Sequence, residues 1–455
     1  MRPCGPKGTV LQLRQCPPDD DLHAIVKEHF ALESLAVTPR DRKHVADARA
    51  LDILSAKTRR INGHWQSNLL WKAEEVNLPN NRDQATRRLV AIERKMARNP
   101  EFAAAYRIEI DNLLKKGYAR RLSKEEEPQP GGKTWFLPHF AVSNLNKKMR
   151  LVFDAAAVTR GTCLNDALLT GPDLLHSLLG VLFRFRERPV AITGDIREMF
   201  LQISVSTEDR PAQCFLWRQD RTANPDVYQM TSLIFGATSS PATAIYVRDR
   251  NADEFAERYP RAVAAIKRRH YMDDYLDSVD TEEEARQLVH EVKTIHAAGG
   301  FEMHSWASNR PAVLTHVEER FDGSHIRLTD DVRVERTLGL RWSPMEDRLG
   351  FDLSLRKMPR DVADGRRPPT KREMLAAVMS VFDPLGFLAP FTVQAKTITR
   401  CMAQRHRMGR PAGRHHCKAM ERVASHAQIT GNLRSAPLLR ARRRCDRATR
   451  LLRRQ

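Results

Sequence analysis

The fold is decided by the stretch His270-Tyr271-Met272-Asp273-Asp274-Tyr275-Leu276-Asp277-Ser278-Val279. Residues that favour β-strands flank a two-residue acidic tip, which is typical of a tight hairpin. The pattern predicts that the carboxylates of Asp273 and Asp274 lie at the turn. Because an Asp-Asp pair taken alone is most often a pair of solvated loop charges, its interpretation depends on the surrounding sequence.

A helix is expected directly after this hairpin. Thr281 and Glu284 form a Thr-x-x-Glu capping box, and the sequence Gly299-Gly300 marks the end of the helix. Between these signals runs an apolar stripe at helical spacing, formed by Ala285, Leu288, Val289, Val292 and Ile295. The sequence therefore predicts a hairpin packed against a helix.

A third carboxylate is expected near the pair. The run Val190-Ala191-Ile192-Thr193 predicts a strand that delivers Gly194 and Asp195 at its end, where an acidic side chain can face an open site. Three converging carboxylates raise one another's pKa unless cations neutralise them, and such oxygen ligands select Mg²⁺ or Mn²⁺ over zinc. Two bound ions would activate a 3′-hydroxyl and hold a leaving pyrophosphate, which is nucleotidyl transfer.

Composition and charge limit the class of protein. The 455 residues leave room for about three domains. The formal net charge is +20, and residues 401–455 carry 15 Lys or Arg but only two acidic residues. This excess fits a polyanionic partner such as nucleic acid. The seven cysteines are scattered without a Cys-x-x-Cys pair, so we expect reduced thiols and no zinc site.

The remaining patterns predict a soluble α+β protein. No apolar signal or membrane-spanning run is present, so we expect a cytoplasmic or nuclear protein with no membrane partner. Apolar residues between Asn81 and Lys116 predict two amphipathic helices that stop at Gly117. Strand-like runs follow at Trp135–Val142 and Arg150–Phe153. No repeat of solenoid length occurs.

Several blocks carry a family resemblance. They are Leu32-Glu33-Ser34-Leu35, Trp135-Phe136-Leu137-Pro138-His139-Phe140, Leu151-Val152-Phe153-Asp154, Leu164-Asn165-Asp166-Ala167-Leu168-Leu169-Thr170-Gly171-Pro172-Asp173-Leu174-Leu175 and Phe382-Asp383-Pro384-Leu385-Gly386-Phe387-Leu388-Ala389-Pro390. From about Leu22 to Arg400 the chain resembles the reverse transcriptase of BEL/Pao-type LTR retrotransposons. The resemblance implies an RNA-directed DNA polymerase that uses two Mg²⁺ ions, or Mn²⁺, a primed RNA or DNA template and dNTPs.

The resemblance also implies roles for the acidic residues. Asp195, within Thr193-Gly194-Asp195-Ile196-Arg197-Glu198-Met199-Phe200, matches the first polymerase motif and would bind both metals. Asp273 and Asp274 match the Tyr-x-Asp-Asp motif, with Asp273 as the direct ligand and Asp274 in a lesser, indirect role. All three are expected catalytic residues and metal ligands.

Further residues would contact the substrates. Arg150 would neutralise the incoming triphosphate, and Phe200 would exclude a ribose 2′-hydroxyl by its bulk. Phe235 and Gly236 would hold the templating base and nucleotide, while Leu338 and Gly339 would grip the primer. Each has a structural alternative: Arg150 as a surface cation, Phe200 as a core aromatic, and residues 235–241 as an ordinary helix start.

The implied architecture is a right-hand polymerase fold with an antiparallel palm sheet. Residues 1–95 are expected to be a connecting region of the polyprotein. The fingers would comprise residues 96–167 and 204–239, and the palm residues 168–203 and 240–345. A thumb-like region would follow at residues 346–400, and residues 401–455 would form a disordered basic tail, in which no zinc is expected.

Two features depart from the family pattern. In His304-Ser305-Trp306 a lysine is expected directly before the tryptophan, and its absence would lower turnover without preventing metal binding. Protease, RNase H and integrase signatures are not found, which suggests a piece of a Pol polyprotein. The alternatives are a catalytically inactive relic that binds nucleic acid through salt-sensitive phosphate contacts, or a degraded copy without a selected function.

Overall fold

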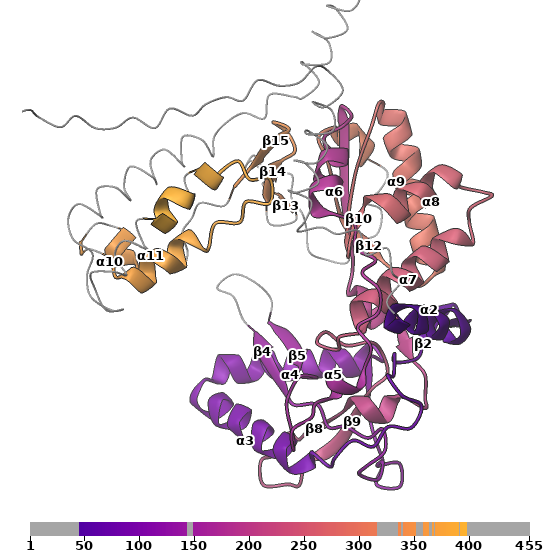
Figure 1. The fold of residues 1–455 in the computed structure, drawn as a ribbon, viewed down its shortest axis with the longest axis vertical. Coiled ribbons are helices and arrows are strands. Elements are labelled where there is room, and N and C mark those ends of the chain that lie inside the picture. The colour runs from indigo at the N-terminus through magenta and orange to yellow at the C-terminus, as the bar shows by residue number, and fades with distance from the viewer. Residues whose placement is uncertain are drawn as a thin grey trace, which may run out of the picture.

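The computed structural model describes residues 45–142, 149–315, 335–337, 340–351, 358–363, 366–367, 369–390 and 392–397 (Figure 1). Helices alternate with mainly antiparallel sheets along these segments, so the predicted α+β class is confirmed. None of the helices in the described segments is long and apolar enough to cross a membrane.

A four-stranded antiparallel sheet organises the predicted palm. Its order is β10-β11-β6-β12. Alternate side chains of its central strands point to opposite faces, as the two-residue period of a strand requires. Ala191 and Leu276 pack on one face, whereas Ile192 and Tyr275 pack on the other. The strands are β6 (Val190–Ile196), β10 (His270–Tyr271), β11 (Asp274–Val279) and β12 (Met303–Ser308).

Helices cover both faces of this sheet. On one face lies α6 (Leu178–Phe185), whose Val181 and Phe185 pack with Leu276 and Trp342. Three mutually packed helices lie on the other face (Figure 1). They are α7 (Ser240–Asp253), α8 (Pro260–Arg269) and α9 (Glu282–Ala298).

Helix α9 agrees with its sequence signals. Thr281 Oγ1 accepts a hydrogen bond from Glu284 N at 3.2 Å, as a helix N-cap should. The Glu284 carboxylate bonds to Asp280 N. The whole predicted apolar stripe is buried, from Ala285 to Ile295. The predicted packing of hairpin and helix is confirmed by the contacts of α9 with β11 and β6.

The predicted fingers contain a second sheet and a hairpin. The sheet has the order β3-β9-β8, and the hairpin pairs β4 with β5. The two predicted helices end at Arg98 and Lys115, and Asn99 Oδ1 caps the second helix by accepting from Phe102 N at 2.9 Å. The elements are α3 (Arg82–Arg98), α4 (Pro100–Lys115), β3 (Ala119–Arg121), β4 (His139–Val142), β5 (Arg150–Phe153), α5 (Leu164–Ala167), η2 (Met199–Gln202), η3 (Arg210–Gln213), β8 (Cys214–Trp217) and β9 (Asp226–Met230).

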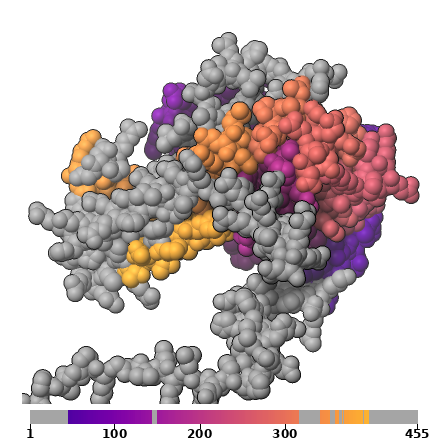
Figure 2. Space-filling view, turned by 90° about the horizontal axis from the view of Figure 1, so that it is seen from above, coloured from indigo at the N-terminus to yellow at the C-terminus, as the bar shows by residue number. Residues whose placement is uncertain are grey.

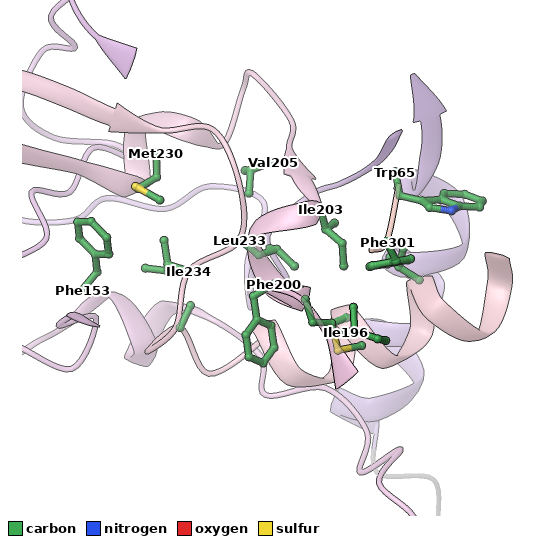
Figure 3. Close-up of a cluster of buried hydrophobic side chains, with 14 of the residues drawn as sticks. Trp65, Phe153, Ile196, Phe200, Ile203, Val205, Met230, Leu233, Ile234 and Phe301 are labelled. Atoms are coloured by element: carbon green, nitrogen blue, oxygen red, sulfur yellow. The ribbon is translucent and has the colours of Figure 1, made fainter. Parts of the chain in front are cut away.

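Residues before position 96 share the same hydrophobic core. Helix α2 (Val45–Lys57) is followed by β1 (Arg59–Ile61) and β2 (His64–Ser67), and β2 pairs in parallel with β7 (Ser204–Val205). Trp65 is buried in one cluster with Phe301 and Phe200 (Figure 3). The described part of residues 1–95 therefore packs with the predicted polymerase body, while the boundary at residue 95 stays a prediction.

The C-terminal elements connect to α6 through Trp342. This side chain meets Phe185 edge to face, with ring centroids 5.0 Å apart. In Figure 2 the yellow residues near the C-terminal end of the described segments lie apart from the red-coloured palm residues. The elements are η4 (Pro311–Val313), β13 (Glu335–Thr337), β14 (Leu340–Ser343), β15 (Arg348–Gly350), α10 (Arg360–Ala363) and α11 (Lys371–Val378). Residues 1–44 and 401–455 lie outside the described segments.

Candidate active site

Asp195 lies between two neighbouring strands of the palm sheet. It is the penultimate residue of β6 and pairs in register with Asp274 of β11 on one side and His304 of β12 on the other. Directly opposed residues on adjacent strands bring their side chains close together. Antiparallel pairing thus places Asp195 and Asp274 beside each other, although they are far apart in the sequence.

Asp273 lies in the hairpin turn itself. The register pairs Tyr271 with Asp274, so the two turn residues are Met272 and Asp273. The expectation that both aspartates occupy the turn is wrong, because Asp274 already belongs to β11 and pairs with β6. Asp273 O accepts a hydrogen bond from Ile196 N at 3.0 Å, which fixes the turn to the end of β6.

The three carboxyl groups interact electrostatically. Burial, and then the negative charge of Asp195, raise the pKa of Asp273. Burial, Asp273 and Asp195 raise the pKa of Asp274 to about 7. Arg150 and His304 act in the opposite direction on Asp273, which identifies Arg150 as a cation whose field reaches the site. Asp273 and Asp274, whose ionisation is disfavoured in this way, lie beside the Asp195 side chain, and a cation bound among them would stabilise their charged forms.

The donor chemistry fits Mg²⁺ or Mn²⁺, since all three predicted ligands offer carboxylate oxygens. Among the described residues, however, no group of three or more His, Cys, Asp or Glu side chains has the spacing of a metal site. The strand register brings the predicted ligands to one end of the palm sheet. The assignment of Asp195, Asp273 and Asp274 as metal ligands stays a prediction.

His304 is a neighbour of Asp195 that sequence reasoning missed. Its Nε2 lies 3.0 Å from Asp195 Oδ2, and its Nδ1 contacts Ser305 Oγ. Ser305 has a φ of 53° and stands at an irregularity of β12 between His304 and Ala307. The sequence marks Ser305 only as a missing lysine. A prediction that β12 pairs with β6 would have placed His304 next to Asp195, but the sequence did not predict this pairing.

Gly194 leaves space for Trp306 beside the acidic cluster. A Cβ atom on Gly194 would lie 2.9 Å from Cε3 of the Trp306 ring and 3.1 Å from Cε of Met303. Real Cβ atoms rarely tolerate such a contact with a packed ring. The glycine before Asp195 is therefore required by the packing of an indole against β6.

The two predicted aromatic residues contact each other. Phe200 in η2 is 8% exposed, and Phe235 is 44% exposed. Their rings meet edge to face with centroids 4.5 Å apart. Phe200 is therefore a core aromatic, as its structural alternative predicts (Figure 3). It also lies next to the exposed ring of Phe235, at the predicted nucleotide site.

Gly236 brings two chain segments together. Its φ is 113°, and a Cβ atom there would lie 2.3 Å from Phe153 O. Asn165 bridges this loop, donating to Gly236 O at 3.0 Å and accepting from Thr238 N at 2.9 Å. The backbone at Gly236 therefore approaches β5 closely, whereas its contact with the templating base and nucleotide stays a prediction. Leu338 and Gly339, the predicted primer-grip residues, lie outside the described residues.

Comparison with family models matches residues 138–305 to a model described as "Reverse transcriptase (RNA-dependent DNA polymerase)". This match covers the three aspartates. The chain contains a reverse transcriptase domain. A second match assigns residues 370–429 to the "Pao retrotransposon-like RNaseH-like domain". Together the matches bear out the expected BEL/Pao-type Pol sequence. The expectation that RNase H-related sequence is missing is wrong for this second segment.

Solved structures of similar fold are reverse transcriptases. The foamy viral protease-reverse transcriptase dRH in complex with double-stranded DNA has a TM-score of 0.51 and 15% identity, and it is matched over 94% of this chain. The chain spans 63% of that protein's length. The foamy viral protease-reverse transcriptase with an RNA/DNA hybrid has a TM-score of 0.47 and 16% identity over 94% of this chain and 48% of that one.

At such identity the first likeness concerns the fold, and it confirms the right-hand polymerase fold. No curated protein sequence matches the chain.

Proposed function

We propose that this reverse transcriptase domain is an active RNA-directed DNA polymerase that adds dNTPs to a primer by two-metal nucleotidyl transfer. The main support for this proposal is the pairing of β6 with β11. It places Asp195 directly opposite Asp274, and Asp273 lies in the adjoining turn. Asp273 and Asp274, whose pKa values are raised, lie with Asp195 at one end of the sheet, and such a group of carboxyl oxygens is suited to binding divalent cations.

The chain's own residues have separate tasks in this proposal. Asp195 and Asp273 would hold Mg²⁺ directly, and Asp274 would support them. Bound Mg²⁺ would supply a lowered pKa at the primer 3′-hydroxyl and charge neutralisation at the leaving pyrophosphate. Arg150 would bind the triphosphate, since its charge already acts at Asp273.

Substrate choice would depend on aromatic bulk. The Phe200 ring, backed by Phe235, would leave no room for a ribose 2′-hydroxyl and so favour dNTPs over rNTPs. The template would be RNA or DNA bearing a primer. Support comes from the matched family description and from the basic balance of the chain.

A specific observation favours a second candidate, an inactive domain that binds nucleic acid. Ser305 replaces the expected lysine, and no formed three-ligand metal group occurs among the described residues. In this candidate the fold and its phosphate contacts persist without polymerisation.

Primer extension on an RNA template with Mg²⁺ separates the two candidates. The proposed enzyme makes cDNA, and Asp273→Asn abolishes synthesis while retaining template binding. A matched control is Asp280→Asn, because Asp280 follows β11 but pairs with Arg188 at the surface. Equal and absent synthesis in all three proteins, with binding retained, would establish the inactive candidate instead.

A further inference from the structure

Helix α7 carries a buried arginine whose side chain reaches the catalytic turn. The Arg248 side chain is 2% exposed. Its Nε and Nη2 donate to Asp249 Oδ1 at 2.9 and 2.7 Å, and its Nη1 donates to Met272 O at 3.1 Å. A buried guanidinium requires a counter-charge and acceptors for its N–H groups. Asp249 supplies the charge, and the turn carbonyl supplies a further acceptor.

The turn that accepts this bond is conformationally unfavourable. Met272 has a φ of 58°, in the left-handed region that side chains with a Cβ atom disfavour. A two-residue hairpin with positive φ at its first turn position usually has glycine there. Such a backbone persists only where the surrounding structure fixes it.

Both carbonyl groups of the turn are held from outside the hairpin. Met272 O accepts from Arg248 of α7, and Asp273 O accepts from Ile196 N of β6. The second bond belongs to the backbone and is independent of side-chain identity. The first depends on a single side chain, that of Arg248 in α7, so a substitution at this position can remove it.

The groups around Arg248 leave Asp249 as its neutralising partner. The charge of Arg248 acts on two buried histidines, His270 and His296. Burial, followed by the Arg248 charge, lowers the pKa of His270. Burial, with a smaller effect of Arg248, lowers the pKa of His296 to about 4. Both rings are thus neutral at pH 7. The Arg248 guanidinium therefore has the Asp249 carboxylate and the Met272 carbonyl as its hydrogen-bond acceptors.

We propose that Arg248 is a positioning residue that fixes the strained Met272 backbone and thereby aims the Asp273 carboxylate at Asp195. This inference rests on the proposed polymerase function for its effect on catalysis. The restraint of the turn by α7 is a structural property, so it can be measured even if the protein has no polymerase activity.

The test compares Arg248→Met, which removes every donor, with Arg248→Lys, which retains a charge and a donor. A displaced carboxylate lowers kcat, because small misplacements of reacting groups cost up to about 100-fold in rate. We expect Arg248→Met to lower kcat for single-nucleotide incorporation by about 10- to 100-fold, with the KM for dNTP and the Kd for template-primer within about twofold. Arg248→Lys should recover part of the loss.

Asn251→Ala is the matched control for simple destabilisation. Asn251 is buried on the same helix and bonds to Trp65 Nε1 and Ile295 O, away from the turn. It should lower the melting temperature without the selective loss of kcat. An equal loss of kcat in Asn251→Ala at a matched fall in melting temperature would overturn the inference.

Hydrogen exchange provides the readout that does not require turnover. Arg248→Met should accelerate exchange of amides in residues 270–276 by about 10- to 100-fold, the size expected for loss of a hydrogen bond to a charged donor. Asn251→Ala should instead accelerate exchange near residues 59–66. Unchanged exchange at 270–276 in Arg248→Met overturns the inference even if the wild-type protein proves inactive.

A double variant covers the case in which Arg248→Met does not fold. Met272→Gly removes the cost of positive φ at the turn. The increase in amide exchange rate that Arg248→Lys causes at residues 270–276 should therefore be smaller in the Met272→Gly background than in the wild type. Equal increases in the two backgrounds would show that Arg248 does not act through this turn.

Discussion

Asp195 and Asp274 oppose each other across the antiparallel register of β6 and β11. Burial and two neighbouring carboxylates raise the pKa of Asp274 to about 7, from 3.8 when unperturbed. Between these values the folded state binds one more proton than the unfolded state, so the free energy of unfolding falls as pH rises. The site thus lowers stability at neutral pH when no cation is bound.

We predict that Asp274→Asn is more stabilising at pH 8 than at pH 5. In buffer without divalent ions the difference in unfolding free energy relative to wild type should grow by roughly 2–4 kcal/mol over this range. Urea denaturation at both pH values measures it. A difference that is independent of pH would show that Asp274 is not forced to protonate.

Two buried histidines should make the fold sensitive to acid. Burial lowers the pKa of His139 and of His296 to about 4. Between pH 4 and 6.5 the unfolded state binds more protons, so stability is lost as pH falls. We expect about 3 kcal/mol per ring over this range. Replacement of both by glutamine should flatten the dependence of the urea midpoint on pH, and a slope that stays unchanged would contradict this.

Phe200→Val should relax selection against ribonucleotides. Removing ring bulk at the predicted sugar position should lower the ratio of kcat/KM for dNTP over rNTP by about 10- to 100-fold. Single-nucleotide extension with each substrate measures the ratio. Phe185→Leu, a core change in α6, is the control and should leave the ratio intact. Retained discrimination in Phe200→Val would favour a purely structural role.

Gly236→Ala should damage both stability and nucleotide binding. The added Cβ would stand 2.3 Å from Phe153 O at a φ of 113°, so the loop or β5 must move. We expect a loss of about 2 kcal/mol or more in unfolding free energy and a higher KM for dNTP. Gly63→Ala is the control, because Gly63 also has a positive φ but no neighbour within 4 Å of its Cβ position. Equal losses in the two variants would exclude the Phe153 contact as the cause.

His304→Ala should lower kcat by about tenfold while leaving template binding unchanged. The change removes the Nε2 contact that orients Asp195 Oδ2. His304→Gln offers an amide donor and should recover part of the rate. Single-turnover incorporation gives the comparison. Full activity in His304→Ala would show that Asp195 needs no such support.

Much of the site follows from local sequence. The strand that carries Asp195, the acidic hairpin and the apolar stripe of α9 are each encoded within a few residues. The structure contains all three, and the strand continues to Ile196. Local patterns were insufficient at the turn, because register with β6 rather than side-chain acidity decides that Asp274 belongs to a strand.

Long-range pairing accounts for what was missed. His304 meets Asp195 only because β12 joins β6, and Arg248 meets Met272 only because α7 packs beneath the hairpin. No sequence motif at His304 or Arg248 indicates which residue it contacts. The burial of Trp65 in the common core likewise depends on residues that follow much later in the chain.

The hydrogen bond between Trp65 and Asn251 joins positions separated by 186 residues. A ribosome adds about 5–20 residues per second, so the early hairpin is synthesised about 10–40 s before its anchoring helix. During that interval an indole destined for the interior stays accessible to chaperones and proteases. Slower translation between residues 67 and 251 would extend this exposure, so the speed of synthesis contributes to how much correctly folded protein a cell obtains.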